Sequence, residues 1–422
     1  MARKKRPSTL RNLLIVMGLV GATAAMAIGL NFVDRTAPLI LPEQFDATFD
    51  EARRQSEDNA LHTLHAANDL LPDTPDALRD TIWNLVNDLG QESRPMNPVL
   101  GNHLGVVFDC APNEMTAYLL QCEAAAAKMY EGLAKPYYLA TEPPHSLSRW
   151  ERLRFTRLGI CTMGYGAVLT HAPETARRGL EVLLDTVRLS RMVVLEEGGQ
   201  MPSRGIEELA MQAITVAARK PQCAPHLDWL QAELEKLGPP FADRLALLHR
   251  FWRKADNTMT YKRARADVSG FVRRAVILRD TRYRAKAWAK HRPFLEQLMS
   301  QPLSKVNHLM HSDPAVKVDL DNDDTKLWFH IGLIIEATRQ DLYFQRTLLQ
   351  VALQRYRQKN AAWPPTLEAL VPEFIAALPI DPMNGLPFRY TNDGTKAQLY
   401  SVGENEVDET GGGDDVVLLM LE

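Results

Sequence analysis

The sequence predicts a mainly α-helical protein with a small α+β module at its C-terminal end. Apolar residues recur at helical spacing over most of residues 47–323, which we interpret as a helical domain built from packed hairpins. Residues 324–422 combine one long amphipathic helix with Pro-, Asn- and Gly-rich turns and short β-prone segments, which predicts a short antiparallel sheet. Ahead of both, an uncharged apolar run at residues 12–33 predicts an N-terminal transmembrane helix.

The N-terminal residues predict where the protein is located. Residues 1–11 are a basic n-region with five Lys and Arg side chains, and residues 12–33 would span roughly 30 Å as a helix, the thickness of a bilayer core. Because basic flanks stay in the cytoplasm, we expect a single-pass protein of the cell inner membrane with its N-terminus cytoplasmic and its body periplasmic. In an alternative, an A-x-A sequence at residues 25–27 ends a cleaved signal peptide, and the body is secreted or periplasmic. Both interpretations export the body, and residues 34–46 then form a linker.

Capping residues and glycines mark helix boundaries in the helical domain. Thr74-Pro75 has the composition of an N-cap followed by the first helical residue. Between Leu180 and Leu195 the apolar residues fall on one stripe, which predicts a helix with one buried face. Gly198-Gly199 is expected to end that helix.

Four cysteines are present in a body that we expect to be exported, so disulfides are chemically permitted. They are Cys110, Cys122, Cys161 and Cys223, and four cysteines allow three pairings among which the sequence does not choose. Buried free thiols and one disulfide, such as Cys110 to Cys122, are the alternatives. No C-x-x-C pair occurs, which argues against a zinc site and against thioredoxin-like chemistry.

Charge is unevenly distributed along a chain whose net charge is only −3. Residues 262–292 carry eleven Lys and Arg against two Asp, whereas residues 381–422 carry nine acidic residues against two basic ones. The basic stretch predicts a surface for anionic lipid or an acidic partner, or else a solvated helix face, and the acidic tail could dock on it. Nucleic acid is not an expected partner of an exported domain. The basic residues that would form the surface are Arg273, Arg274, Arg279, Arg282, Arg284, Lys286 and Lys290.

The last hundred residues form one unit by their order of signals. A long helix is expected to end near Asn360, where Trp363-Pro364-Pro365 interrupts it, and Thr366 is expected to cap a short helix over residues 367–371. Turn residues follow at 381–387, and Asn392-Asp393-Gly394 separates two β-prone segments, which predicts a hairpin. An acidic Gly-rich loop then leads to a final apolar strand at residues 416–421.

This order resembles the globular part of type II secretion major pseudopilins. The similarity covers roughly residues 345–418 and includes Tyr356-x-x-x-Asn360-x-x-Trp363-Pro364, TLEALV, LPIDPMNGLPFRY, LYSVG and GGGDDVV. The whole layout resembles single-pass proteins of planctomycete and verrucomicrobial type. The chain departs from pseudopilins because residues 12–33 follow no prepilin-peptidase site and contain no acidic residue. The resemblance implies a pilin-like fold, protein partners in the cell envelope, and calcium held by Asp408 and Asp415 with help from Asn405 and Asp414.

Other patterns give weaker signals for chemistry. His62 with His65 and His308 with His311 have a spacing that could share a metal, but ordinary surface or boundary histidines are the simpler interpretation. Residues 319–324 begin like an EF-hand loop but fail at positions 6 and 12, so we interpret them as a helix N-terminus capped by Asp324.

No P-loop, G-x-S-x-G or G-x-G-x-x-G motif is present in the sequence. We therefore expect no catalytic or cofactor-binding residue, and we expect a membrane-anchored, exported, non-catalytic scaffold that works by protein contact and could form a homo-oligomer. An enzyme whose site is assembled by several helices, and a sensor of calcium or lipid, are the alternatives.

Overall fold

The computed structural model describes residues 56–76, 114–136, 138, 149–193, 202–239, 293–298, 301–306, 327–393, 396–403, 405, 407–413 and 415–421. These residues are mainly helical and carry a three-stranded antiparallel sheet at the C-terminal end, as the sequence predicts. Within the described part of the chain, no helix is both long and apolar enough to cross a membrane. The predicted transmembrane run at residues 12–33 lies outside the described residues, as do the linker and the Gly198-Gly199 helix stop.

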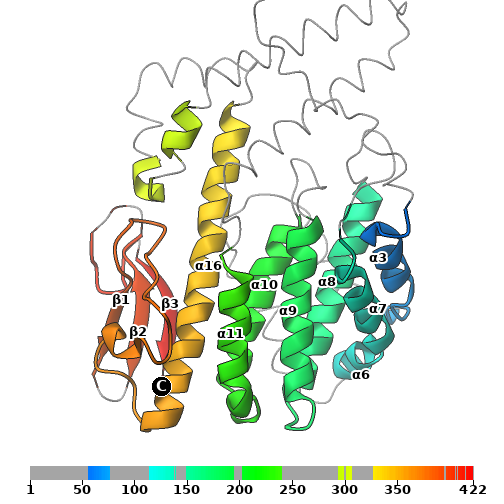
Figure 1. Ribbon diagram of the computed structural model, residues 1–422, viewed down its shortest axis with the longest axis horizontal. Coiled ribbons are helices and arrows are strands. Elements are labelled where there is room, and N and C mark those ends of the chain that lie inside the picture. The colour runs from blue at the N-terminus through cyan, green and yellow to red at the C-terminus, as the bar shows by residue number, and fades with distance from the viewer. Residues whose placement is uncertain are drawn as a thin grey trace, which may run out of the picture.

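The elements are arranged as a row with the sheet at one end (Figure 1). The helix α16 stands between the sheet and the helices α10 and α11, followed by α9, α8 and then α3, α6 and α7 at the far end (Figure 1). The helices are α3 Ala60–Asp69, α6 Glu114–Leu120, α7 Glu123–Leu133, α8 Arg149–Leu169, α9 Ala176–Val193, α10 Pro202–Ala217, α11 Leu227–Leu237 and α16 Leu327–Asn360, with 3₁₀ turns η3 Pro221–His226 and η5 Leu367–Leu370. The strands are β1 Arg389–Asn392, β2 Ala397–Ser401 and β3 Val416–Leu421.

The helices α8 and α9 form a tight hairpin because two glycines face each other across it. A Cβ atom on Gly179 would lie 2.7 Å from the carbonyl oxygen of Gly166, so only glycine allows this backbone approach. One turn further along, the hydroxyl groups of Thr162 and Thr186 lie 3.3 Å apart, and each also donates to a carbonyl of its own helix. The predicted apolar residues Leu180, Leu183, Leu184 and Val187 of α9 are all fully buried. Val182, Asp185 and Thr186 are buried as well, so α9 is enclosed on more than the one face that the sequence predicts.

The C-terminal elements agree closely with the sequence prediction. The helix α16 ends at Asn360, and β1 and β2 form the predicted antiparallel hairpin, with Asn392 opposite Ala397. β3 adds to the other side of β2, with an irregularity between Leu399 and Tyr400. The short helix expected after Thr366 is instead a single 3₁₀ turn, and the Thr366 side chain makes no capping hydrogen bond to it. A turn of four residues between two proline-containing segments is too short to develop α-helical hydrogen bonding.

One arginine joins four helices at the centre of the row. Arg191 of α9 forms an ion pair with Glu207 of α10 at 2.8 Å, and these two side chains are only 17% and 5% exposed. Its Nη1 donates to the carbonyl groups of Leu237 and Gly238, at 3.2 Å and 2.9 Å, where α11 has no further helical donors. The guanidinium group also lies 5.5 Å from the ring centre of Phe344 in α16.

We expect the Arg191→Ala variant to be destabilised by about 2–4 kcal/mol, because it removes the arginine from the buried Glu207 carboxylate and the donors from the end of α11. The control is Arg178→Ala, which removes a 42% exposed arginine paired with Glu181 and should cost less than about 1 kcal/mol. Urea unfolding followed by circular dichroism measures both values. Equal losses in the two variants would show that the junction contributes no more than a surface pair.

Candidate functional site

The C-terminal module, residues 361–421, is the region that the sequence marks as the candidate interaction site. The chain leaves α16 through Ala361, whose φ of 56° turns it back toward the sheet. The side chain of Trp363 is then buried against the module. The carbonyl oxygen of Pro364 accepts hydrogen bonds from the Tyr390 hydroxyl and the Asn392 amide, both at 3.0 Å. The Trp-Pro pair therefore joins the end of the helix to the first strand.

A buried carboxylate organises the turn at residues 381–386. Asp381 is fully buried, and its two oxygens accept from the backbone N–H of Met383 at 2.9 Å and from the side-chain amide of Asn384 at 3.0 Å. The Asn384 side-chain oxygen accepts in turn from the N–H of Leu386 at 2.7 Å. Burial raises the pKa of Asp381, and the hydrogen bonds from Ser401, Met383 and Asn384 oppose this rise. The predicted Asp-Pro and Asn-Gly turn residues thus form one hydrogen-bonded unit.

The same turn fixes the module to the helical body. Backbone N–H groups of Leu303 and Ser304 donate to the carbonyl groups of Pro382 and Met383, at 3.2 Å and 2.9 Å. These bonds come from a segment that precedes α16 in the chain. The turn is therefore held from both sides, by the sheet through Ser401 and by the body through residues 303–304.

We expect the Asp381→Asn variant to be less stable by about 1–3 kcal/mol at pH 4, because buried donors lose an acceptor of matching geometry. The pKa of Asp381 is higher in the folded than in the unfolded chain, so the folded protein retains this proton where the unfolded chain has released it. The stabilisation that comes from the protonated Asp381 is complete below the unfolded-state pKa, at a pH of about 4. It is lost as the pH rises through the higher pKa of the folded state. Urea unfolding from pH 4 to 7 should therefore show the gap between wild type and variant narrowing. The control is the exposed Asp58→Asn, and a gap that widens with pH would contradict the raised pKa.

A second contact, centred on Arg355, holds the module against α11. The Nε atom of Arg355 lies 2.6 Å from the Asp228 carboxylate, and Nη1 donates to the carbonyl of Phe374 at 2.6 Å. The guanidinium also lies 5.6 Å from the centre of the Phe374 ring. One turn later, Lys359 pairs with Glu373. Together these contacts make the helix, the module and the body one connected structure.

The acidic loop does not assemble a calcium site from its described residues. Asp408 accepts from the Tyr400 hydroxyl at 3.0 Å and lies 3.4 Å from the Arg389 guanidinium, while one oxygen of Asp415 accepts from the N–H groups of Glu409 and Gly411. The amide oxygen of Asn405 accepts from the N–H of Val407 at 2.6 Å. Among the described residues, no group of three His, Cys, Asp or Glu side chains could hold a metal ion. Asp414 lies outside these residues.

These carboxylates instead close the loop on itself. The Arg389 guanidinium beside Asp408 would repel a divalent cation. Asp415 caps the turn, because one of its oxygens accepts hydrogen bonds from two backbone N–H groups. Sequence resemblance predicted oxygen ligands at the right places in the chain, but it could not show that Arg389 of β1 reaches the loop. Among the described residues the loop brings no three metal-ligating side chains together, and the second oxygen of Asp415 is buried without a hydrogen-bond partner. Because Asp414 lies outside the described residues, calcium binding by Asn405, Asp408, Asp414 and Asp415 stays a prediction.

We expect calcium to leave the stability unchanged. Addition of about 1 mM calcium, or its removal with EDTA, should move the melting temperature by less than about 1 °C, since Asp408 is paired with Arg389 and Asp415 accepts from two backbone N–H groups. The Asp415→Ala variant should lose about 1–3 kcal/mol in either condition, because two N–H groups lose their acceptor. Differential scanning calorimetry provides the measurement. A calcium-dependent rise that Asp415→Ala abolishes would show that the loop binds the ion after all.

The remaining predicted site residues fall into two groups. The basic surface at residues 273–290, His308, His311 and residues 319–324 all lie outside the described part of the chain, so docking of the acidic tail on the basic stretch stays a prediction. His62 and His65 are described, and they do not share a site: His62 is exposed, whereas the His65 ring packs 5.6 Å from that of Phe155. The simpler interpretation of this pair, a surface and a boundary histidine, is the one that the structure supports.

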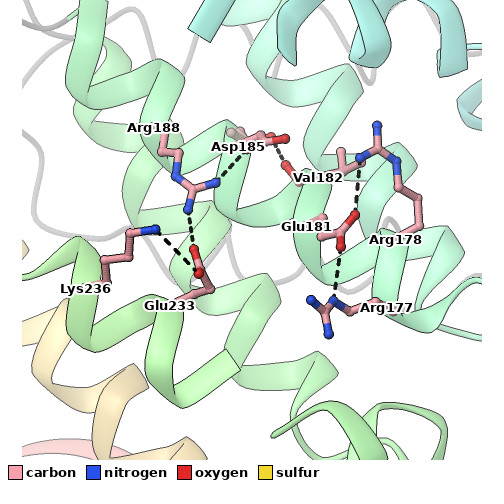
Figure 2. Close-up of polar contacts among 9 residues, drawn as sticks. Arg177, Arg178, Glu181, Val182, Asp185, Arg188, Glu233 and Lys236 are labelled. Atoms are coloured by element: carbon pink, nitrogen blue, oxygen red, sulfur yellow. Dashed lines mark hydrogen bonds and ion pairs between the residues drawn. The ribbon is translucent and has the colours of Figure 1, made fainter. Parts of the chain in front are cut away.

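A charged network between α9 and α11 is absent from the sequence prediction (Figure 2). Arg188 bridges Asp185 of its own helix at 2.9 Å and Glu233 of α11 at 2.8 Å. Burial raises the pKa of Asp185, and Arg188 opposes the rise. Near the start of α9, two to three turns earlier, Arg177 lies 3.5 Å from the ring centre of Trp229. The pair of Arg188 with Glu233 connects α9 to α11. The other ion pairs of the network join residues three or four apart within one helix, a spacing that can be read from the sequence, whereas the contact between the two helices cannot.

Three of the four cysteines are described, and all three are buried free thiols. The predicted alternative, a bond from Cys110 to Cys122, involves one residue outside the described part. The Sγ atom of Cys122 donates to the carbonyl of Tyr118 at 3.8 Å, and interaction with Cys161 together with burial raises the pKa of Cys122. Interaction with Cys122 lowers the pKa of Cys161, helped by Tyr118 and by the charge of Arg157 and opposed by burial. No sequence motif relates these two cysteines, since 38 residues lie between them.

Exposed apolar side chains gather on the C-terminal module. Ile380 is 54% exposed and forms an antiparallel bridge with Pro387, and the neighbouring Leu386 is 45% exposed. Val371, Val407 and Val417 of the same module are also exposed. At the other end of the row, the exposed apolar residues are Leu70, Leu120 and Tyr130 of the α3, α6 and α7 region.

Comparison with protein-family models, with curated proteins and with solved structures gives no match for this chain.

Proposed function

We propose that the protein is a membrane-anchored, exported scaffold that binds other proteins of the cell envelope through its C-terminal module and catalyses no reaction. The observation that supports this most directly is the exposed pair Ile380 and Leu386 on a rigidly fixed turn. Apolar side chains held in place by Asp381 and by the body lose little conformational freedom when a partner covers them. Such preorganised apolar residues are typical anchors of protein interfaces.

The arrangement of the module supports a pilin-like fold. A long helix packs against a small antiparallel sheet, and the connection through Trp363 and Pro364 uses the residues on which the resemblance to pseudopilins rests. The position of the helix differs from what polymerisation along a helix surface would require. Every residue from 346 to 353 of α16 is buried, because α10 and α11 cover the helix on one side and the module covers it on the other.

A partner must therefore contact the module rather than α16. In this proposal the apolar run at residues 12–33 holds the chain in the inner membrane, and the helical body presents the module to envelope assembly proteins in the periplasm. The basic stretch at residues 262–292 would add contact with anionic lipid headgroups.

The proposal is tested by site-specific photo-crosslinking in intact cells. A photoreactive phenylalanine analogue at Leu386 should crosslink to envelope proteins, identified by mass spectrometry, including pseudopilin-like assembly components. The matched control is the same analogue at Leu120, which is 46% exposed but lies on α6 at the far end of the row from the sheet (Figure 1). The double variant Ile380→Asp, Leu386→Asp should lose these partners in co-purification from solubilised membranes while keeping its melting temperature within about 2 °C of wild type, because both positions are exposed.

Three results would contradict the scaffold. They are crosslinks from Leu386 to lipid alone, equal crosslinking from Leu386 and Leu120, or an intact mass showing that the mature chain begins after residue 27 and purifies alone. The intact mass is read on the same purified material.

A further inference from the structure

Two polar side chains of α16 are buried without hydrogen-bond partners. Arg346 is 8% exposed and Gln350 is 0% exposed. Among the described residues, the Nε and Nη2 atoms of Arg346 and both amide atoms of Gln350 meet no hydrogen-bond donor or acceptor. Buried polar groups in folded proteins almost always have such partners, because an unpaired group is costly to remove from water and an unpaired charge is more so. This pair of residues is therefore suited to a polar ligand.

The polar groups next to this pair do have partners. The helices α10 and α16 pack against each other (Figure 1), and between them the hydroxyl groups of Thr215 and Thr347 lie 3.1 Å apart. Thr215 also donates to the carbonyl of Met211 at 2.9 Å, and Thr347 donates to the carbonyl of Tyr343 at 3.0 Å. The two unpaired side chains are four residues apart, so they lie on one face of α16, beside these satisfied hydroxyl groups.

The unpaired atoms of Arg346 form the edge of a guanidinium group that binds oxyanions. Nε and Nη2 point to the same side of the planar group, and their two parallel N–H bonds match the two oxygens of a carboxylate or a phosphate. The guanidinium carbon lies 5.1 Å from the centre of the Tyr343 ring. This contact with the ring helps to fix the orientation of the group, so the free edge is preorganised.

The charges near Arg346 favour an anion as the ligand. Burial lowers the pKa of Arg346, the charges of Tyr343 and Glu208 oppose this, and the positive charge of Arg219 adds to it. Arg339 contributes a further positive charge beside Tyr343. Arg219 is exposed and Arg339 is half-buried, so positive charge extends from the buried guanidinium toward solvent and would attract an anion.

Gln350 determines what else the ligand must carry. Its amide nitrogen donates hydrogen bonds and its amide oxygen accepts them, so a ligand that satisfies both must offer an acceptor and a donor. A simple carboxylate has acceptors only. A carboxylate with a hydroxyl or ammonium group on the next carbon has both, within the reach of two side chains that are one helical turn apart.

We propose that Arg346 and Gln350 bind a small carboxylate that carries a hydroxyl or ammonium group, that is, a hydroxy acid or an amino acid. The carboxylate contacts the Nε and Nη2 edge of Arg346, and the amide of Gln350 contacts the hydroxyl or ammonium group and one carboxylate oxygen. Monohydrogen phosphate also combines acceptors with a donor, so the experiment must distinguish it. The site belongs to the helical body, and it does not depend on the scaffold function of the C-terminal module.

The first test measures the melting temperature of the full-length chain in detergent by differential scanning calorimetry. Because the site is buried, the protein is refolded from urea with the probe present, at about 10 mM and matched ionic strength. Glycolate and glycine are the probes, phosphate is the rival, and acetate is the matched control that lacks a donor. We expect glycolate or glycine to raise the melting temperature by at least about 2 °C more than acetate does.

Variants of the two residues show whether this rise comes from the proposed site. Arg346→Met and Gln350→Met should abolish it, whereas Arg357→Met, which removes an exposed arginine of the same helix, should keep it. Without a probe, Arg346→Met should melt no lower than wild type, because an apolar side chain replaces a buried charge that has no partner. If Arg346→Met does not fold, Gln350→Met and the difference between glycolate and acetate decide the question.

The second test identifies the bound molecule. The protein is purified from its own cells without a denaturing step, and the small molecules released on unfolding are identified by mass spectrometry. We expect one hydroxy acid or amino acid in close to equal molar amount, and none with Arg346→Met.

Four results would overturn the proposal. A rise that Arg346→Met retains would place the effect elsewhere in the chain. Equal rises with acetate and glycolate would remove the role of Gln350, and a rise with phosphate alone would assign the residues to phosphate. No rise with any probe, together with no released acid, would show that water alone satisfies these side chains.

Discussion

The structure depends on the guanidinium group of Arg191. This side chain is the point at which α9, α10, α11 and α16 meet, and each contact answers a different need: the buried charge of Glu207, the free carbonyl groups at the end of α11, and the apolar face of Phe344. An arginine can do this because its planar fork presents several donors and an apolar face at once, which lysine cannot. The surrounding leucines supply the driving force for packing, but leucine contacts alone would permit several rotations of these helices about their axes. The arginine contacts favour one of these rotations, because the hydrogen bonds of the arginine need fixed partners.

The same junction determines where the C-terminal module lies. Arg191 aligns α11 with α16, and Arg355, three turns further along α16, joins Asp228 at the start of α11 to the carbonyl of Phe374 in the module. The two arginines therefore contact opposite ends of α11, and α11 runs antiparallel to α16. The chain passes directly from α16 into the module through Ala361 and Trp363. The position of α16 in the body therefore determines the orientation of the sheet.

Local signals in the sequence predict local structure well here. The end of α16 at Asn360, the turn at 381–386 and the hairpin at Asn392 each depend on a few neighbouring residues, and each was predicted. The 3₁₀ turn after Thr366 was predicted as a helix because propensity does not report how little length is available between prolines. The contacts of Arg191, the contact of the Tyr118 hydroxyl with Cys161 and the ion pair of Asp408 with Arg389 join distant positions. A single sequence contains no signal for them.

The difference between local signals and contacts of distant residues explains why the sequence predicts the position of the acidic loop but not its chemistry. Its position after β2 follows from the hairpin, whereas its chemistry depends on which strand residue reaches it, and that residue is Arg389, on β1. Once Asp408 is paired and Asp415 caps the loop, the acidic residues act as structural parts of the module. In the proposed function, a partner would contact the exposed apolar side chains of the module, Ile380 and Leu386. A turn held by a buried carboxylate on one side and by the body on the other presents those side chains in a fixed position, which is the requirement for recognition by surface contact.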